Sequence, residues 1–188
     1  GVLSKAAGVL ALNSLRVHSA SVNGHEGAAI NSFVVSPHFG SPPAAELLRQ
    51  QLILAIDGEL DVMGALEKKE AESASTARAG EIRAAVPINA PAAPPKVLWH
   101  DGAGTGHVVA EIRATDRAGL LAVLTRVFER AGVDIAWAKV TTMGSSVVDA
   151  FGIVLPAGDS VARQTLEREL FAVLPAPPPV KQVQEEAS

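Results

Sequence analysis

The chain has 188 residues, a formal net charge of −4, 48 % hydrophobic residues and no cysteine. This length allows one large or two small domains, and disulfides and thiolate metal sites are excluded. No apolar run reaches the roughly 18 residues of a membrane span, and there is no Lys/Arg cluster of the kind that binds nucleic acid or an anionic membrane. Without a recognisable signal peptide, a cytoplasmic protein is expected.

The first part of the chain reads as a helix, a hairpin and further helices. Apolar spacing and turn signals predict a helix over 2–15, a strand over 16–22, a turn at Asn23-Gly24, a strand over 27–36 and a helix that opens at Pro42-Pro43 and continues in broken form to about Glu70. Residues 71–95 are rich in Ala, Ser and Pro. Such a composition buries too little surface to offset its ordering entropy, so a disordered insertion is expected there.

The second part has the clearer pattern. It predicts strands over 96–100 and 107–114, a helix over 117–131, a hairpin of 133–142 and 146–155 about Met143-Gly144, a helix over 160–174 and a disordered tail over 175–188. Asp116 can cap the helix by accepting a backbone N–H. Gly132 is the residue expected to end it.

The chain contains an internal repeat. With an offset of 118 residues, the separation of Gly1 from Gly119, Val9 aligns with Val127 and Phe33 aligns with Phe151. An offset held for about 35 residues indicates two copies of one unit. Because only the second copy has a strand before its glycine, the chain is expected to be a fragment in which the first copy lacks its first strand.

Elements in the order strand, helix, strand, strand, helix are typical of a split βαβ unit. We therefore predict an α+β protein of two ferredoxin-like βαββαβ units, with an antiparallel sheet and helices on one face. The first unit would be 1–70, with 96–100 as candidate closing strand, and the second 107–174. With a strand missing, amides of the first unit are expected to exchange faster than those of the second.

The turn 115–121 is the first candidate site. Gly119 permits a close approach because it has no Cβ, and the first N–H groups of the helix suit a carboxylate. An ordinary capped strand-to-helix turn is the alternative. Asp149 and its counterpart Asn31 are polar residues at one strand position in both copies. They mark either an edge or interface position, or a ligand contact.

Several short motifs are assigned structural roles. His100-Asp101 lacks the further ligands of a metal phosphohydrolase and is read as a turn. The glycines of 102–106 precede a strand rather than a helix, which favours a connector over a phosphate loop. Gly144-Ser145 lacks the Asp-x-Asp of a nucleotidyltransferase and is read as a hairpin. The five histidines show no i, i+4 pairing, so no metal site is expected.

A family resemblance follows from four segments. ATDRAGLL (114–121), AGVDI (131–135), AKVTT (138–142) and VVDAF (147–151) resemble an ACT domain, and more narrowly the tandem ACT pair at the C-terminus of bifunctional PII uridylyltransferase/uridylyl-removing enzymes. The resemblance covers about 1–36 and 96–174. It implies a module whose two ACT domains pair with each other. This module would sense glutamine and regulate a parent enzyme that acts on the PII protein. The catalytic domains and their Mg²⁺ would lie in that parent enzyme, and this chain would hold no catalytic residue and no cofactor.

The resemblance also implies the ligand contacts. They are Asp116, Arg117, Ala118, Gly119, Leu120 and Leu121, with Asp134 on the facing strand, and the first-copy counterparts are Gly1, Val2, Leu3 and Arg16. Two alternatives remain open. The pair is a ligand-free scaffold of its host enzyme, or the chain is an enzyme by itself.

Overall fold

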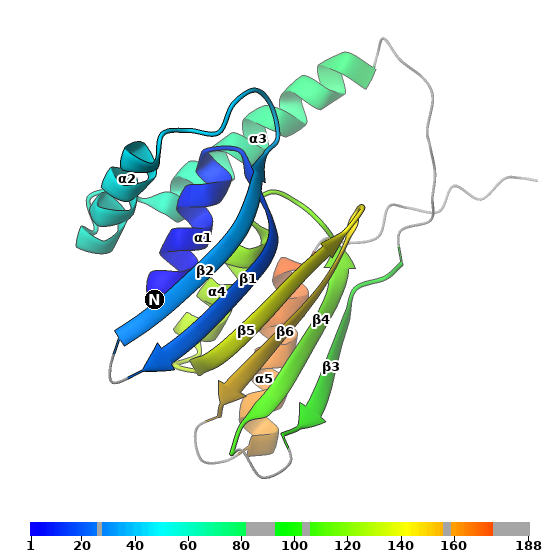
Figure 1. Cartoon of the computed structure of the whole chain (residues 1–188). Helices are drawn as coiled ribbons and strands as arrows, with labels where there is room; N and C mark the ends of the chain where they lie inside the picture. The colour runs from blue at the N-terminus through cyan, green and yellow to red at the C-terminus, as the bar shows by residue number, and fades with distance from the viewer. Residues whose placement is uncertain (26–27, 82–92, 103–105, 156–158, 175–188) are drawn as a thin grey trace, which may run out of the picture.

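The computed structural model describes residues 1–25, 28–81, 93–102, 106–155 and 159–174 (Figure 1). In chain order, the elements are α1 (Val2–Leu12), β1 (Leu15–His25), β2 (Ala28–Pro37), α2 (Ala45–Asp57), α3 (Val62–Glu81), β3 (Lys96–Asp101), β4 (Val108–Thr115), α4 (Leu120–Arg130), β5 (Asp134–Met143), β6 (Ser146–Val154) and α5 (Asp159–Val173).

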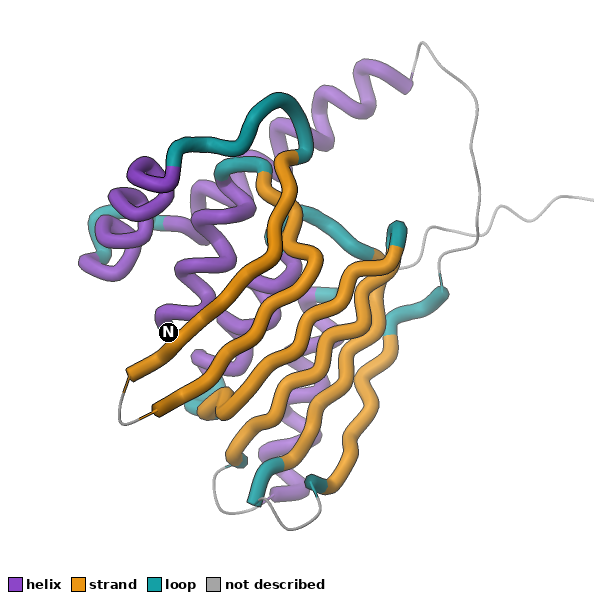
Figure 2. The backbone as a smooth tube through the Cα atoms, viewed as in Figure 1, coloured by secondary structure: helices purple, strands orange, loops and turns teal. Residues whose placement is uncertain are grey.

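The described strands form one six-stranded antiparallel sheet in the order β2-β1-β5-β6-β4-β3. Figure 2 shows these strands as a single layer, and in Figure 1 helices α1, α4 and α5 all lie behind it. The predicted fold class is confirmed: the protein is α+β, with helices on one face of an antiparallel sheet. The arrangement is consistent with tandem ferredoxin-like units.

The two copies join edge to edge through β1 and β5. Ser21 lies directly opposite Lys139 in this pairing, and these two residues are also equivalent under the 118-residue offset. An approximate twofold axis therefore passes through this pair. The same axis brings α1 against α4, which are the equivalent helices of the two copies.

Strand β3 corrects the predicted domain boundaries. It pairs antiparallel with β4, with Val97 opposite Ile112, so it adds a fourth strand to the second copy and does not close the first. Trp99 faces the helices, and its Nε1 donates to Glu167 Oε2 of α5 at 2.8 Å. The sequence predicted only three strands for the second copy. Its fourth strand is β3, which precedes that copy in the chain.

Other boundaries shift as well. Helix α3 continues to Glu81, so the first part of the predicted 71–95 insertion is helical, while 82–92 and the tail 175–188 lie outside the described residues. Asn23-Gly24 belongs to β1 rather than to the turn. Helix α2 begins at Ala45, after the two prolines. Because β1 is paired on both sides, β2 is the strand of the first copy in which we expect faster amide exchange, since it lies at an edge of the sheet as β3 does.

Helix α4 ends as predicted but begins differently. Gly132 N–H donates to Glu129 O at 3.1 Å and Val133 N–H to Phe128 O at 3.0 Å, which is a Schellman motif. At the other end the N-cap is Gly119, with φ 75°, and no side chain caps the helix. The prediction that Asp116 is the cap is therefore wrong, because the turn is three residues longer than expected.

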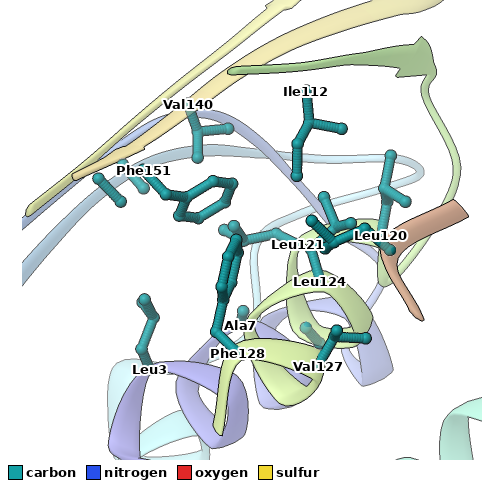
Figure 3. Packing of buried hydrophobic residues seen from close by; sticks show 14 of the residues in the cluster. Leu3, Ala7, Ile112, Leu120, Leu121, Leu124, Val127, Phe128, Val140 and Phe151 are labelled. Atoms are coloured by element: carbon teal, nitrogen blue, oxygen red, sulfur yellow. The ribbon is translucent and has the colours of Figure 1, made fainter. Parts of the chain in front are cut away.

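The core lies between the sheet and the layer of α1 and α4. Figure 3 shows Phe151, Val140 and Ile112 reaching from the strands toward Leu124 and Phe128 of α4. The rings of Phe128 and Phe151 are fully buried, with centroids 4.9 Å apart. Burying each such side chain contributes about 2–3 kcal/mol, so these contacts stabilise the stacked layers.

A register shift in β5 decides which residues face away from the helices. It falls between Ile135 and Trp137 and turns Ile135 to the same side as Ala138 and Val140. Trp137 then lies on the opposite face over Gly152, where an added Cβ would overlap the indole. Strict alternation along the strand would place Ile135 and Trp137 on one face, and the bulge is the reason that they lie on opposite faces.

Candidate functional site

A cavity of about 220 Å³ opens between the helix layer and the sheet, where the two copies meet. Its walls come from α1, the start of β1, the β4–α4 turn, β5 and β6, with Lys69 of α3 and His38 after β2 at the side. All six predicted contacts from Asp116 to Leu121 line it. The structure thus brings the candidate turn to a concave surface, which is what a small-molecule site requires.

Backbone contacts hold the turn in place. Asp116 N–H donates to Ser145 O at 2.8 Å, in the hairpin between β5 and β6, and Leu120 N–H donates to Arg117 O at 3.2 Å. Gly119 adopts the left-handed conformation at φ 75°, and a Cβ there would lie 3.4 Å from Leu66. With no side-chain cap, the first N–H groups of α4 remain a site of partial positive charge.

Arg16 and Asp116 lie next to each other in the wall of the cavity. Arg16 Nε lies 3.4 Å from Asp116 Oδ2, yet this nitrogen has no hydrogen-bond partner, so the contact is an ion pair without a hydrogen bond. Burial raises the pKa of Asp116, and the charges of Arg16 and His38 oppose that rise. One cation and one carboxylate from different copies therefore stand side by side.

Two further cations are used in holding the walls together. Lys69 Nζ donates to Ala11 O, Leu12 O and Ser14 Oγ at 3.0, 2.8 and 2.9 Å, which fixes the end of α1, and burial lowers the pKa of Lys69. Arg117 pairs closely with Glu70 of α3. Sequence reasoning missed Lys69, because it lies 55 to 58 residues along the chain from the acceptors at the end of α1 and gives no local signal there.

Asp149 lies on the helix-facing side of β6, opposite Ile112 and Val140, and lines the same cavity. It is 1 % exposed, and its Oδ1 has no hydrogen-bond partner. Burial raises its pKa to about 7, a backbone hydrogen bond from Thr141 opposes the rise, and the charge of Asp116 adds to it. The repeat had marked this position, but only the fold shows that it is buried.

The remaining predicted residues lie elsewhere. Asp134 does not line this cavity but a second one of about 400 Å³, together with Gly1, Val2, Leu3 and Asn31. Arg16, assigned to the first copy, instead joins the Asp116 turn. The twofold arrangement explains why Arg16 lies beside the turn of the second copy and Asp134 lies beside the start of the first copy, since the turn of each copy faces the strand start of the other.

The described residues contain neither a metal-binding cluster nor a membrane-spanning helix. No group of three or more His, Asp or Glu side chains within them could hold a metal ion. No helix within them is both long and apolar enough to cross a membrane.

Comparison with known proteins shows similarity to bifunctional uridylyltransferase/uridylyl-removing enzymes. No family model matches the chain. It is 55 % identical over 178 residues to a bifunctional uridylyltransferase/uridylyl-removing enzyme of Mycobacterium tuberculosis (strain H37Rv), covering 94 % of this chain and 22 % of that protein. The enzyme of that name from Streptomyces coelicolor is 37 % identical, and the match covers 87 % of this chain and 20 % of that protein. The enzyme from Azospirillum brasilense is 29 % identical, and the match covers 80 % of this chain and 16 % of that protein. This chain is therefore homologous to a segment of the bifunctional uridylyltransferase/uridylyl-removing enzymes and spans about a fifth of the length of the first of them.

Proposed function

We propose that this chain is an amino-acid-binding regulatory module of the ACT type within a bifunctional uridylyltransferase/uridylyl-removing enzyme, with L-glutamine as its effector. The observation that supports this most is the cavity between the copies, in which the Asp116 turn meets Arg16. Its volume of about 220 Å³ is below the roughly 300–1,000 Å³ of sites for drug-sized ligands, which favours a small metabolite.

The charges suit the two ends of an amino acid. The uncapped start of α4 and the guanidinium group of Arg16, whose side chain is 38 % exposed, can donate to an α-carboxylate. The carboxylate of Asp116 can accept from the α-ammonium group. Because the walls belong to both copies, a ligand that bridges them stabilises one relative placement of the copies over others.

The regulated activities would reside in the rest of the longer enzyme. We propose that the module is linked there to a Mg²⁺-dependent nucleotidyl transfer to the PII protein and to the removal of that group. Ligand occupancy would favour one activity by binding one arrangement of the module more tightly.

Calorimetric titration and thermal unfolding of the 188-residue chain with L-glutamine test the binding. At 100 times its dissociation constant, glutamine should add about 2.7 kcal/mol to the free energy of unfolding. Asp116→Ala should abolish this gain, whereas Asp57→Ala, which removes an exposed carboxylate at the end of α2, should keep it. Failure of every amino acid to bind the unaltered chain would overturn the proposal.

A ligand-free scaffold is the second candidate. It is favoured by the continuous β1–β5 pairing and the α1–α4 packing, which join the copies without a ligand. In that case Asp116→Ala would leave the regulation of the full-length enzyme intact. Trp137→Ala, on the open face of the sheet, would instead disrupt association in gel filtration.

A further inference from the structure

Helix α3 packs against both copies at once. Its first residue, Val62, lies against Gly8 of α1, where an added Cβ would overlap it, and Leu66 lies against Gly119 of the second copy. Both side chains are buried, so the first half of α3 is anchored on the seam between α1 and α4. In Figure 1 the far half of α3 extends beyond the other helices.

Two adjacent residues of α3 each hold one wall of the cavity of about 220 Å³. Lys69 Nζ donates to two carbonyl oxygens at the end of α1 and to Ser14 Oγ, just before Arg16 in the chain. Glu70 pairs with Arg117 of the turn. Since both ties come from one helix, the position of α3 sets how far the strand start of the first copy lies from the turn of the second.

The twofold-related cavity has no such tie. The second cavity, of about 400 Å³, contains Asp134, which is the counterpart of Arg16 under the 118-residue offset. Among the described residues that line this second cavity, none belongs to α3, whereas Lys69 lines the first cavity. Helix α3 therefore breaks the approximate twofold symmetry and supports one cavity of the two.

We propose that Lys69 and Glu70 are positioning residues of the amino-acid site, and that a ligand in the first cavity and the docking of α3 stabilise each other. This inference rests on the proposed function, the binding of an amino acid in that cavity. A ligand that bridges Arg16 and Asp116 fixes the spacing of the same two wall segments that α3 ties together. Whichever is fixed first reduces the ordering cost of the other, and this coupling acts equally in both directions.

The two ties differ in how much they contribute to folding. The side chains of Arg117 and Glu70 are 29 % and 44 % exposed, and an ion pair so accessible to water contributes little to stability. Removing the ammonium group of Lys69, in contrast, leaves three acceptors without their donor. A change at Glu70 should therefore weaken binding with little effect on folding, which separates a positioning role from a merely structural one.

Calorimetric titration of the 188-residue chain with L-glutamine tests the positioning. Glu70→Ala should weaken binding by about fivefold or more, since fivefold is the lower end of typical coupling between sites, and should leave the urea midpoint of unfolding nearly unchanged. Glu67→Ala removes an exposed carboxylate one turn earlier on α3 and should bind as the unaltered chain does. Lys69→Met should also weaken binding, and Lys69→Arg, which keeps a donor for the end of α1, should restore it.

Hydrogen exchange tests the coupling in the reverse direction. Saturating L-glutamine should slow the amides of residues 62–73 by about fivefold or more relative to those of α2, which packs on α1 without lining the cavity. The difference between the two helices should be smaller in Glu70→Ala.

The outcomes separate the two proposals. If no amino acid binds, the proposed function fails and this inference fails with it. If amino acids bind but Glu70→Ala binds as tightly as Glu67→Ala, this inference is overturned while the proposed function stands. Exchange that slows no more in α3 than in α2 of the unaltered chain also overturns it and requires no variant to fold.

Discussion

Replacing Asp149 by asparagine is expected to change how the free energy of unfolding depends on pH. In the folded chain, burial raises the pKa of this carboxyl from 3.8 to about 7. Between these two values the unfolded chain is ionised while the folded chain keeps its proton. The folded state therefore binds more protons, and its stability falls as the pH rises from about 4 to about 7.

The magnitude follows from the two pKa values. Each pH unit between them changes the free energy of unfolding by about 1.4 kcal/mol, so the carboxyl lowers stability by about 4 kcal/mol between acid and neutral pH. This is a large part of the 5–15 kcal/mol typical of a folded protein. Asparagine stays neutral throughout, so relative to the unaltered chain the variant should gain stability steadily as the pH rises.

Urea denaturation at half-unit steps from pH 4 to pH 8 measures this difference. Glu111→Gln is the matched control with the opposite sign, because a hydrogen bond from Arg113 lowers the pKa of Glu111. Its carboxylate contributes stability above the ordinary pKa, and that contribution is lost as the pH falls. Parallel curves for Asp149→Asn and the unaltered chain would refute the reasoning, since they would mean that the carboxyl is not desolvated.

Three further predictions concern packing and turns. Gly119→Ala and Gly132→Ala each place alanine at positive φ and should each lower the free energy of unfolding in urea by about 1–2 kcal/mol. Only Gly119→Ala should also weaken amino-acid binding, because only its Cβ would touch a side chain of the cavity wall; equal binding by both would contradict this. Lys69→Met should cost about 2 kcal/mol in the same assay, because three acceptors at the end of α1 lose their donor. Lys68→Met, at the exposed neighbouring position, should change the free energy of unfolding by no more than about 0.5 kcal/mol. Equal losses in the two variants would contradict the role given to the Lys69 hydrogen bonds. Gly152→Ala should cost about 1–3 kcal/mol and shift tryptophan fluorescence, because its Cβ would overlap the facing indole; an unchanged spectrum would mean that the indole has room to move.

Local pattern was sufficient for most of the second copy. The apolar stripe of α4 and the alternation in β4 and β6 are read within a few residues, so these elements lie where the sequence predicts them to within about three residues. Gly132 ends α4 through contacts with the preceding turn alone. The repeat also identified Asn31 and Asp149 as equivalent, because a constant offset is a property of the sequence.

Tertiary structure decided how these pieces meet. The sequence pattern did not assign β3 to one copy, whereas in the structure it pairs with β4 and its Trp99 donates to Glu167 of α5. The register shift before Trp137 depends on cross-strand contacts that no single strand contains. The site depends on the same level of structure: Arg16 meets Asp116 only when the twofold pairing of β1 with β5 sets one copy against the other, and Asp149 is buried on the helix-facing side of the assembled sheet. Sequence periodicity therefore indicates which residues face inward wherever a strand has no bulge, whereas contacts between distant segments determine which of those residues share a cavity.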